Sequence, residues 1–271
     1  MKKIFCITAV IFLFVLVSSV KAHNLWLNPG NNYPEIGTTV DIGIGFGHKY
    51  PASRVEQEVK DDRLEEIQVI DPDGNIANLI KVSATLYKLK VEKAGAYLVT
   101  AKLKPGYFSM TTEGRKWGDK QSVANCIKCT NYHIEAKTVI IAGGDEKNLS
   151  HVAGQTLELI PLNNPEKIKS GDKLNVRVLF DGMPLSNTSV NATYAGFQDE
   201  DIAPHKPSTE GNQGSRRHFP VETVTNDKGD AKIQLDKPGY WMVLLSHKPS
   251  YPDKEICDEY MYNITFTLQV Q

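Results

Sequence analysis

Short runs that alternate between apolar and polar residues recur along the chain, and they constrain its fold more than any other feature. Alternation at a period of two places apolar side chains on one face of a β-strand. Turn-forming sequences such as Asp71-Pro72-Asp73-Gly74 and Asn226-Asp227-Lys228-Gly229 separate the runs. This pattern predicts an all-β fold of sandwich type. The clearest runs cover residues 38–44, 66–70, 86–91, 96–101, 137–141, 156–160, 173–180, 189–194, 232–235, 241–246 and 262–270.

The chain begins with a segment typical of a secretory signal peptide. Lys2 and Lys3 precede an apolar run over residues 4–17, and Val20-Lys21-Ala22 matches a signal-peptidase site. The apolar run is shorter than the ~20 residues that a membrane-spanning helix needs. We therefore expect cleavage after Ala22, an extracytoplasmic location and no membrane span in the mature chain.

The strand pattern is interrupted by Gly-Gly-Asp-Glu-Lys-Asn at residues 143–148, which indicates a domain boundary. We expect a signal peptide over residues 1–22, an N-terminal β-sandwich over 23–145 and a C-terminal β-sandwich over 146–271. The order of strands and turns in the second half resembles immunoglobulin-like or transthyretin-like secreted modules. Residues 203–220 are rich in Pro, Gly, Ser and charge, and they predict a long loop.

Charge and motif content exclude several functions. Removal of residues 1–22 takes three lysines from the 31 basic residues, which leaves 28 against 32 acidic residues and a net charge of −4. This weakly acidic balance gives no basic footprint for nucleic acid. The chain has no Gly-x-Ser-x-Gly, His-Glu-x-x-His or P-loop sequence. We therefore expect a protein that is neither an enzyme of those classes nor a nucleic-acid binder.

Three cysteines remain in the mature chain: Cys126, Cys129 and Cys257. An exported protein meets an oxidising compartment, so at least one disulfide is expected. We favour a bond between Cys129 and Cys257, because it would link the two halves of the chain. A local bond between Cys126 and Cys129 is the alternative.

Histidines supply the candidate metal ligands. Cleavage after Ala22 would expose His23, whose α-amine and imidazole can form a chelate on a borderline metal ion. His48 follows a strand-like run with glycine at every second position, which suits a close backbone approach. If the two segments pair, three nitrogen donors converge, and such a set suits Ni(II), Co(II) or Cu(II). His247, at the end of an apolar run, is a third candidate; the alternatives are that His48 caps a loop and His247 is a surface residue.

Several segments together carry a resemblance to a known family: residues 23–29, 45–51, 111–114, 179–185, 192–197, 237–241 and 257–263. The chain resembles the DUF4198 family of bacterial exported proteins, often described as nickel-uptake-related. That resemblance implies His23 and His48 as ligands, and a protein that captures or delivers metal for a nickel or cobalt transporter. The family description also mentions a transmembrane region, which this sequence lacks beyond its leader, so the chain could not itself be the permease.

The sequence thus predicts a periplasmic accessory protein that binds a divalent transition metal, Ni or Co first and Cu second, for an inner-membrane permease. One alternative is a copper enzyme, since an N-terminal histidine with a second histidine on a β-sandwich resembles the histidine brace of oxidative polysaccharide enzymes. Another alternative is a carbohydrate-binding or adhesion module that uses the loops around Trp117 and residues 203–220.

Overall fold

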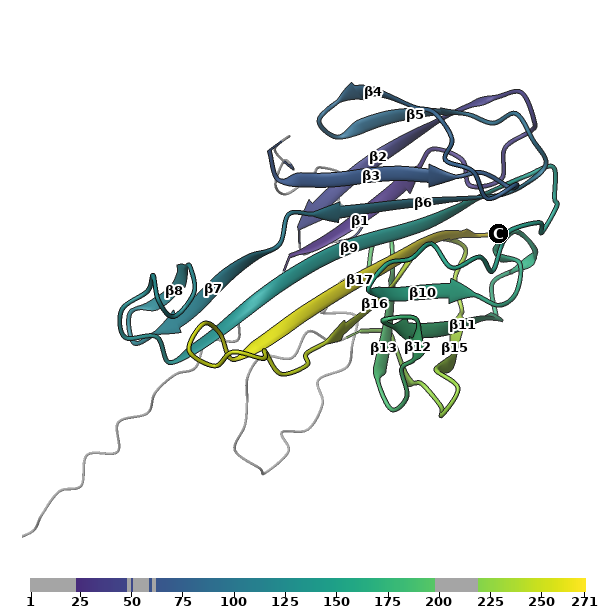
Figure 1. The fold of residues 1–271 in the computed structure, drawn as a ribbon. Coiled ribbons are helices and arrows are strands. Elements are labelled where there is room, and N and C mark those ends of the chain that lie inside the picture. The colour runs from purple at the N-terminus through teal and green to yellow at the C-terminus, as the bar shows by residue number, and fades with distance from the viewer. Residues whose placement is uncertain (1–22, 48–49, 51–58, 60–61, 198–218) are drawn as a thin grey trace, which may run out of the picture.

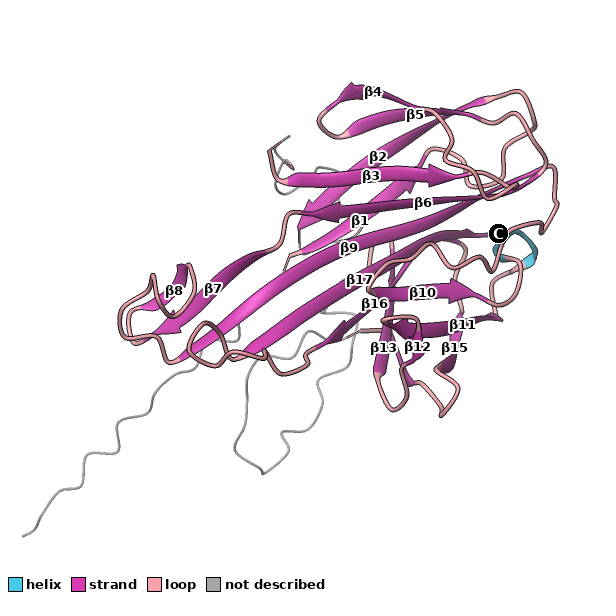
Figure 2. Cartoon of the chain, in the orientation of Figure 1, coloured by secondary structure: helices cyan, strands magenta, loops and turns pink. Residues whose placement is uncertain are grey.

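The computed structural model describes residues 23–47, 50, 59, 62–197 and 219–271 (Figure 1). Their regular secondary structure is almost entirely β-strand, and the helical element drawn in Figure 2 is a short 3-10 helix, η1 (Pro165–Lys167). The predicted all-β, sandwich-type fold is confirmed. The predicted signal peptide, His48 and most of the predicted 203–220 loop lie outside the described residues. Within the described ranges, no helix combines the length and apolar character needed to cross a membrane.

Three sheets build the fold. The central sheet has nine strands in the order β14-β13-β16-β17-β9-β6-β3, with β7 paired to β9 and β8 paired to β7. Its strands are β3 (Leu64–Ile70), β6 (Gly95–Leu103), β7 (Gly106–Thr111), β8 (Gly114–Trp117), β9 (Lys128–Ala142), β13 (Ser189–Tyr194), β14 (Val221–Val224), β16 (Gly239–His247) and β17 (Glu259–Val270).

The other two sheets contain four strands each. The first sheet has the order β1-β2-β5-β4, with β1 (Asn24–Pro29), β2 (Thr39–Gly47), β5 (Leu86–Lys90) and β4 (Leu79–Ser83). The third sheet has β10 (Leu157–Pro161), β11 (Asp172–Phe180), β12 (Met183–Pro184) and β15 (Asp230–Leu235), with β15 paired to β11.

The central sheet buries apolar side chains on both of its faces. On one face, Ile140 of β9 belongs to the same core as Leu25 of β1. On the other face, Val139 of β9 and Phe266 of β17 share a core with Val176 of β11. Since successive residues of a strand point to opposite faces, the side chains of β9 contribute alternately to the two cores. The molecule therefore consists of two β-sandwiches that share their central sheet.

A parallel pairing between β9 and β17 joins the two halves of the chain. The pairing runs from Glu259 opposite Thr130 to Thr267 opposite Thr138. The disulfide joins Cys129, near the start of β9, to Cys257, two residues before β17. It is the long-range pairing that the sequence favours, and it leaves Cys126 as a half-buried thiol.

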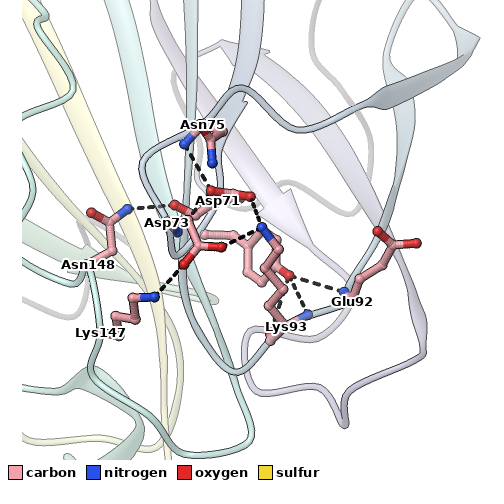
Figure 3. Close-up of polar contacts among 8 residues, drawn as sticks. Asp71, Asp73, Asn75, Glu92, Lys93, Lys147 and Asn148 are labelled. Atoms are coloured by element: carbon pink, nitrogen blue, oxygen red, sulfur yellow. Dashed lines mark hydrogen bonds and ion pairs between the residues drawn. The ribbon is translucent and has the colours of Figure 1, made fainter.

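A polar network fixes the connection between β9 and β10 to the first half (Figure 3). The Lys93 ammonium donates to Asp71 and Asp73 at 2.6 Å each, and Lys147 pairs with the other oxygen of Asp73. The hydrogen bonds to Asp73, of which the one from Lys147 has the largest effect and the one from Lys93 the next, lower the pKa of this carboxyl to about 2. Asn148 donates through Nδ2 to the Asp71 carbonyl at 2.8 Å. The segment that the sequence marks as a boundary is thus attached to the turn after β3.

The glycine-rich run before residue 48 forms β2, and one of its glycines accommodates an aromatic ring. β1 pairs with β2 so that Trp26 lies opposite Gly45. A side-chain Cβ at Gly45 would overlap the indole of Trp26, whereas a Cβ at Gly43 would have its nearest neighbour, the Asn28 carbonyl oxygen, at 3.5 Å. The close backbone approach expected from the sequence is therefore the contact of the buried Trp26 indole with the backbone of Gly45, which has no side chain.

Gly45→Ala should consequently destabilise the protein. Overpacking of a well-filled site costs about 1–3 kcal/mol, so we expect urea unfolding to show a loss in this range. Gly43→Ala on the same strand is the matched control and should change the free energy of unfolding by less than about 1 kcal/mol. Equal effects of the two substitutions would contradict the assignment of Gly45 to indole packing.

Candidate functional site

His23 directly precedes β1 and is half-buried. Its imidazole stacks on the Phe46 ring, with centroids 5.0 Å apart and an interplanar angle of 30°. The Arg63 guanidinium lies 5.4 Å from the centroid of the same ring. The last pair in the β1–β2 register is Asn24 with Gly47. The segment that begins at His23 is therefore held against the end of β2.

Two threonines of the central sheet fix the position of β1. Thr265 and Thr267 donate their hydroxyls to the carbonyls of Leu25 and Leu27, each at 2.6 Å. Asn263 precedes Thr265 by two residues on β17 and is also buried. Its Oδ1 has no hydrogen-bond partner among the described residues. This face of β17 thus holds β1 through Thr265 and Thr267. It also carries the buried Asn263 Oδ1, a hydrogen-bond acceptor without a partner among the described residues.

His247 is the last residue of β16 and lies elsewhere. Its ring makes an edge contact with Phe180 of β11, with centroids 4.6 Å apart. Burial lowers the pKa of His247, and Asp181 opposes that shift. Because β11 covers one face of the central sheet and β1 covers the other, the structure does not bring His247 and His23 together.

Metal-ligating side chains do not form a preassembled cluster in the described part of the chain. No group of three or more His, Cys, Asp or Glu residues is placed there so that it could hold a metal ion. Of the three histidines expected as ligands, His23 and His247 lie on opposite faces of the central sheet, and His48 lies outside the described residues.

An exposed aromatic surface lies on the β7–β8 hairpin, which extends to one side of the molecule in Figure 1. Trp117 is 65% exposed. The Arg115 guanidinium lies 5.5 Å from the ring centroids of both Phe108 and Trp117, and Trp117 meets Tyr132 edge-on at 5.9 Å. We call these four residues the Trp117 surface. An exposed indole beside a guanidinium can combine ring stacking with hydrogen bonding to a partner.

A buried ion pair joins the central sheet to β10. The ammonium of Lys137 lies 2.5 Å from Oε1 of Glu158, and both side chains are almost completely buried. Glu158 also accepts hydrogen bonds from the backbone amides of Ala153 and Gly154, at 2.7 and 3.1 Å. Burial lowers the pKa of Lys137, and Glu158 opposes that shift.

A second buried carboxyl lies next to this pair. Glu135 precedes Lys137 by two residues on β9, so both side chains point to the same face. Its Oε2 is buried without a hydrogen-bond partner among the described residues. Burial raises the pKa of Glu135 to about 7. The carboxyl borders a polar cavity of about 100 Å³, which we call the Glu135 pocket, lined by Glu66, Gln68, Thr100, Ala101, Lys102, Glu135, Ala153, Gly154, Gln155 and Thr156.

Sequence reasoning did not identify this pocket. Glu135 and Lys137 alternate with Ile134 and Ala136, which is the pattern of a strand whose polar face meets water. The face is instead covered by residues 153–158, which are distant in sequence. No motif marks that coverage, so the alternation alone could not have revealed the pocket.

Glu135 should make stability depend on pH. Because its folded pKa is raised from an ordinary 4.5 to about 7, the folded state binds the proton more tightly than the unfolded state does. Its contribution is present below pH 4.5 and is lost as the pH rises through about 7. We expect the stability of wild type relative to Glu135→Gln to fall by about 2–4 kcal/mol over this window, measured by urea unfolding at several pH values. A constant difference would rule out the shift.

The comparisons with known proteins establish the family. No curated protein matches the chain. Among solved structures, the D00-D0 domain of intimin is 14% identical, with 91% of this chain and 99% of that chain covered and a TM-score of 0.21. Salmonella alpha-2-macroglobulin reacted with methylamine is 10% identical, with 94% of this chain and 15% of that chain covered and a TM-score of 0.25. Residues 20–249 match the family described as a domain of unknown function, DUF4198, and the chain therefore belongs to this family.

Proposed function

We propose that the mature protein binds a divalent transition metal, Ni(II) or Co(II) first, through the α-amine and imidazole of His23 and the imidazole of His48. In this proposal the protein acts in the periplasm as an accessory component that captures metal for an inner-membrane permease. The metal is cargo, and the chain itself performs no catalysis.

The observation that carries the proposal is the end of the β1–β2 register. Asn24 pairs with Gly47, and the residues next to them in sequence are His23 and His48. His48 itself lies outside the described residues, so its part in the proposed ligand set rests on its position in the sequence directly after Gly47. The stacking of His23 on Phe46 supports the proposal, because it directs the imidazole of His23 toward the end of β2.

The backbone anchors of β1 support a preorganised site. The bonds from Thr265 and Thr267 hold the strand in place, so the donors of His23 would need little reordering to bind. Less reordering leaves more of the interaction free energy for affinity. His247 is not part of the proposed ligand set, because it lies on the other face of the sheet.

The terminal amine provides the test. Nickel titration calorimetry should compare protein that begins at His23 with protein that carries one extra N-terminal residue, whose amide nitrogen is a far poorer donor. We expect the extension and His23→Ala each to lower the affinity by at least roughly tenfold. His247→Ala is the matched control and should leave the affinity unchanged. Equal affinity of the native and extended proteins would contradict the role of the amine, and copper-dependent peroxide formation with a reductant would favour the copper-enzyme alternative.

The Trp117 surface supports a second candidate function, a carbohydrate-binding or adhesion module. Trp117 is exposed and flanked by Arg115, a combination that suits stacking on a sugar ring and hydrogen bonding to its hydroxyls.

For this candidate, we expect electrophoresis in gels that contain polysaccharides to show retarded migration that Trp117→Ala abolishes. Ile127→Ala removes an equally exposed apolar side chain and should leave the retardation unchanged. Retardation that survives Trp117→Ala, or that is lost equally in both variants, would count against this surface.

A further inference from the structure

We propose that the Glu135 pocket is a binding site for a small organic ammonium ion. The pocket lies between β3, β6, β9 and the segment that leads into β10. It is independent of His23, which lies on the opposite face of the central sheet, so this proposal does not rest on metal binding.

The first argument is a pair of unused hydrogen-bond acceptors. Glu135 Oε2 and Gln155 Oε1 are both buried, and neither has a hydrogen-bond partner among the described residues. Both residues line the pocket. Buried acceptors are almost always satisfied in folded proteins, by protein, water or ligand. The pocket is thus built to receive a group that carries hydrogen-bond donors.

The second argument is that the neighbouring donors are already engaged. The amides of Ala153 and Gly154 both donate to Glu158. Lys137 is committed to the same carboxylate. These donors therefore cannot reach the open acceptors without breaking the buried ion pair. The side-chain amide of Gln155 lies beside the Glu135 carboxyl and lowers its pKa, yet Glu135 Oε2 and Gln155 Oε1 still lack a hydrogen-bond partner among the described residues. A ligand that carries N–H donors would supply one.

The charged groups around Glu135 also favour a cationic ligand. Around Glu135, β3 contributes Glu65 and Glu66, β6 contributes Lys102, β9 contributes His133 and Lys137, and β10 contributes Glu158. Lys102 lies 3.5 and 3.7 Å from the carboxylates on β3, so it is shared between them. With Glu135 ionised, four carboxylates face two ammonium groups, and this excess of negative charge favours a cationic ligand.

An ammonium ion fits these features better than a divalent metal does. The open acceptors are one carboxylate oxygen and one amide oxygen, whereas Ca²⁺ takes six to eight oxygen ligands. A primary ammonium carries three N–H donors on one compact charge. The pocket volume of about 100 Å³ is several times the roughly 10–15 Å³ that one water molecule needs on the same measure, so the pocket admits a group larger than water, such as methylammonium.

Binding should depend on pH through Glu135. The raised pKa of this carboxyl means that acidification neutralises the group that the cation would contact. A bound cation favours the ionised form, so binding near neutral pH must release protons. The affinity should therefore rise as the pH increases through about 7 and level off above it.

The experiment is titration of the full mature protein with methylammonium, followed by amide chemical shifts of Gly154, Gln155 and Thr156. At pH 8.5 we expect saturable shifts, with an affinity that falls by roughly tenfold or more at pH 5.5, where Glu135 is protonated. Tetramethylammonium has the same charge but no N–H donor, and it should not bind. Calcium chloride, added separately, should not produce the same shifts.

Two variants separate the pocket from general electrostatics. Glu135→Gln keeps the size of the side chain and removes its charge, and it should lower methylammonium affinity at pH 8.5 by roughly tenfold or more. Glu66→Gln removes the same charge from the exposed rim and should have less than about a threefold effect. His23→Ala should have none. Absence of saturable shifts in wild type, an equal response to tetramethylammonium, or unchanged binding by a folded Glu135→Gln variant would overturn the proposal.

Discussion

The parallel pairing of β9 with β17 is the interaction on which the rest of the structure depends. It unites one strand from each half into a central sheet that both outer sheets cover. Because both faces of this sheet are buried, successive residues of β9 serve different cores. β17 gives its apolar side chains to one core, and its threonines hold β1 on the other face. The disulfide between Cys129 and Cys257 closes a chain segment of 128 residues across this pairing. In the chain-entropy account, a loop of that length stabilises the fold by about 4–5 kcal/mol through restriction of the unfolded state.

The same pairing determines what each face can do. On the face toward β1, the threonines of β17 hold the backbone that follows His23. On the opposite face, Lys137 reaches Glu158 of β10. A buried ion pair gains little net stability, because desolvation of both charges offsets their attraction, whereas loss of one partner is costly. The pair therefore acts mainly as a constraint: it requires β10 and the segment before it to lie where the wall of the Glu135 pocket forms.

Alternation and turn chemistry were enough to predict the all-β class, the sites of reversal at Asp71 and Asn226, and strands such as β2, β6, β11 and β16. They did not indicate β1, β4, β7, β8, β12 or β14, which lie outside the predicted runs. The expected oxidising compartment predicted a disulfide, and the preference for a bond that links the two halves selected Cys129 with Cys257. Neither signal identifies the partner of a strand, because a period of two is the same whichever strand lies alongside. Three features depend on which strands pair. They are the parallel pairing itself, the placement of His247 on the face opposite His23, and the burial of Glu135 under residues 153–158. Each is fixed by contacts between segments far apart in sequence, and so none could be read from a local pattern.

The two proposed sites share β9 as their support but lie on opposite sides of it. Ile134 faces the core beneath β1, and its neighbour Glu135 faces the polar pocket. Sites that share no contacts and are separated by a packed apolar layer usually respond to substitution independently. Occupation of the Glu135 pocket should thus leave metal binding at His23 unaltered, and the reverse should also hold. A single substitution that abolished both would have to act on β9 itself, through its pairing with β17, because this pairing is the structural element that both sites require.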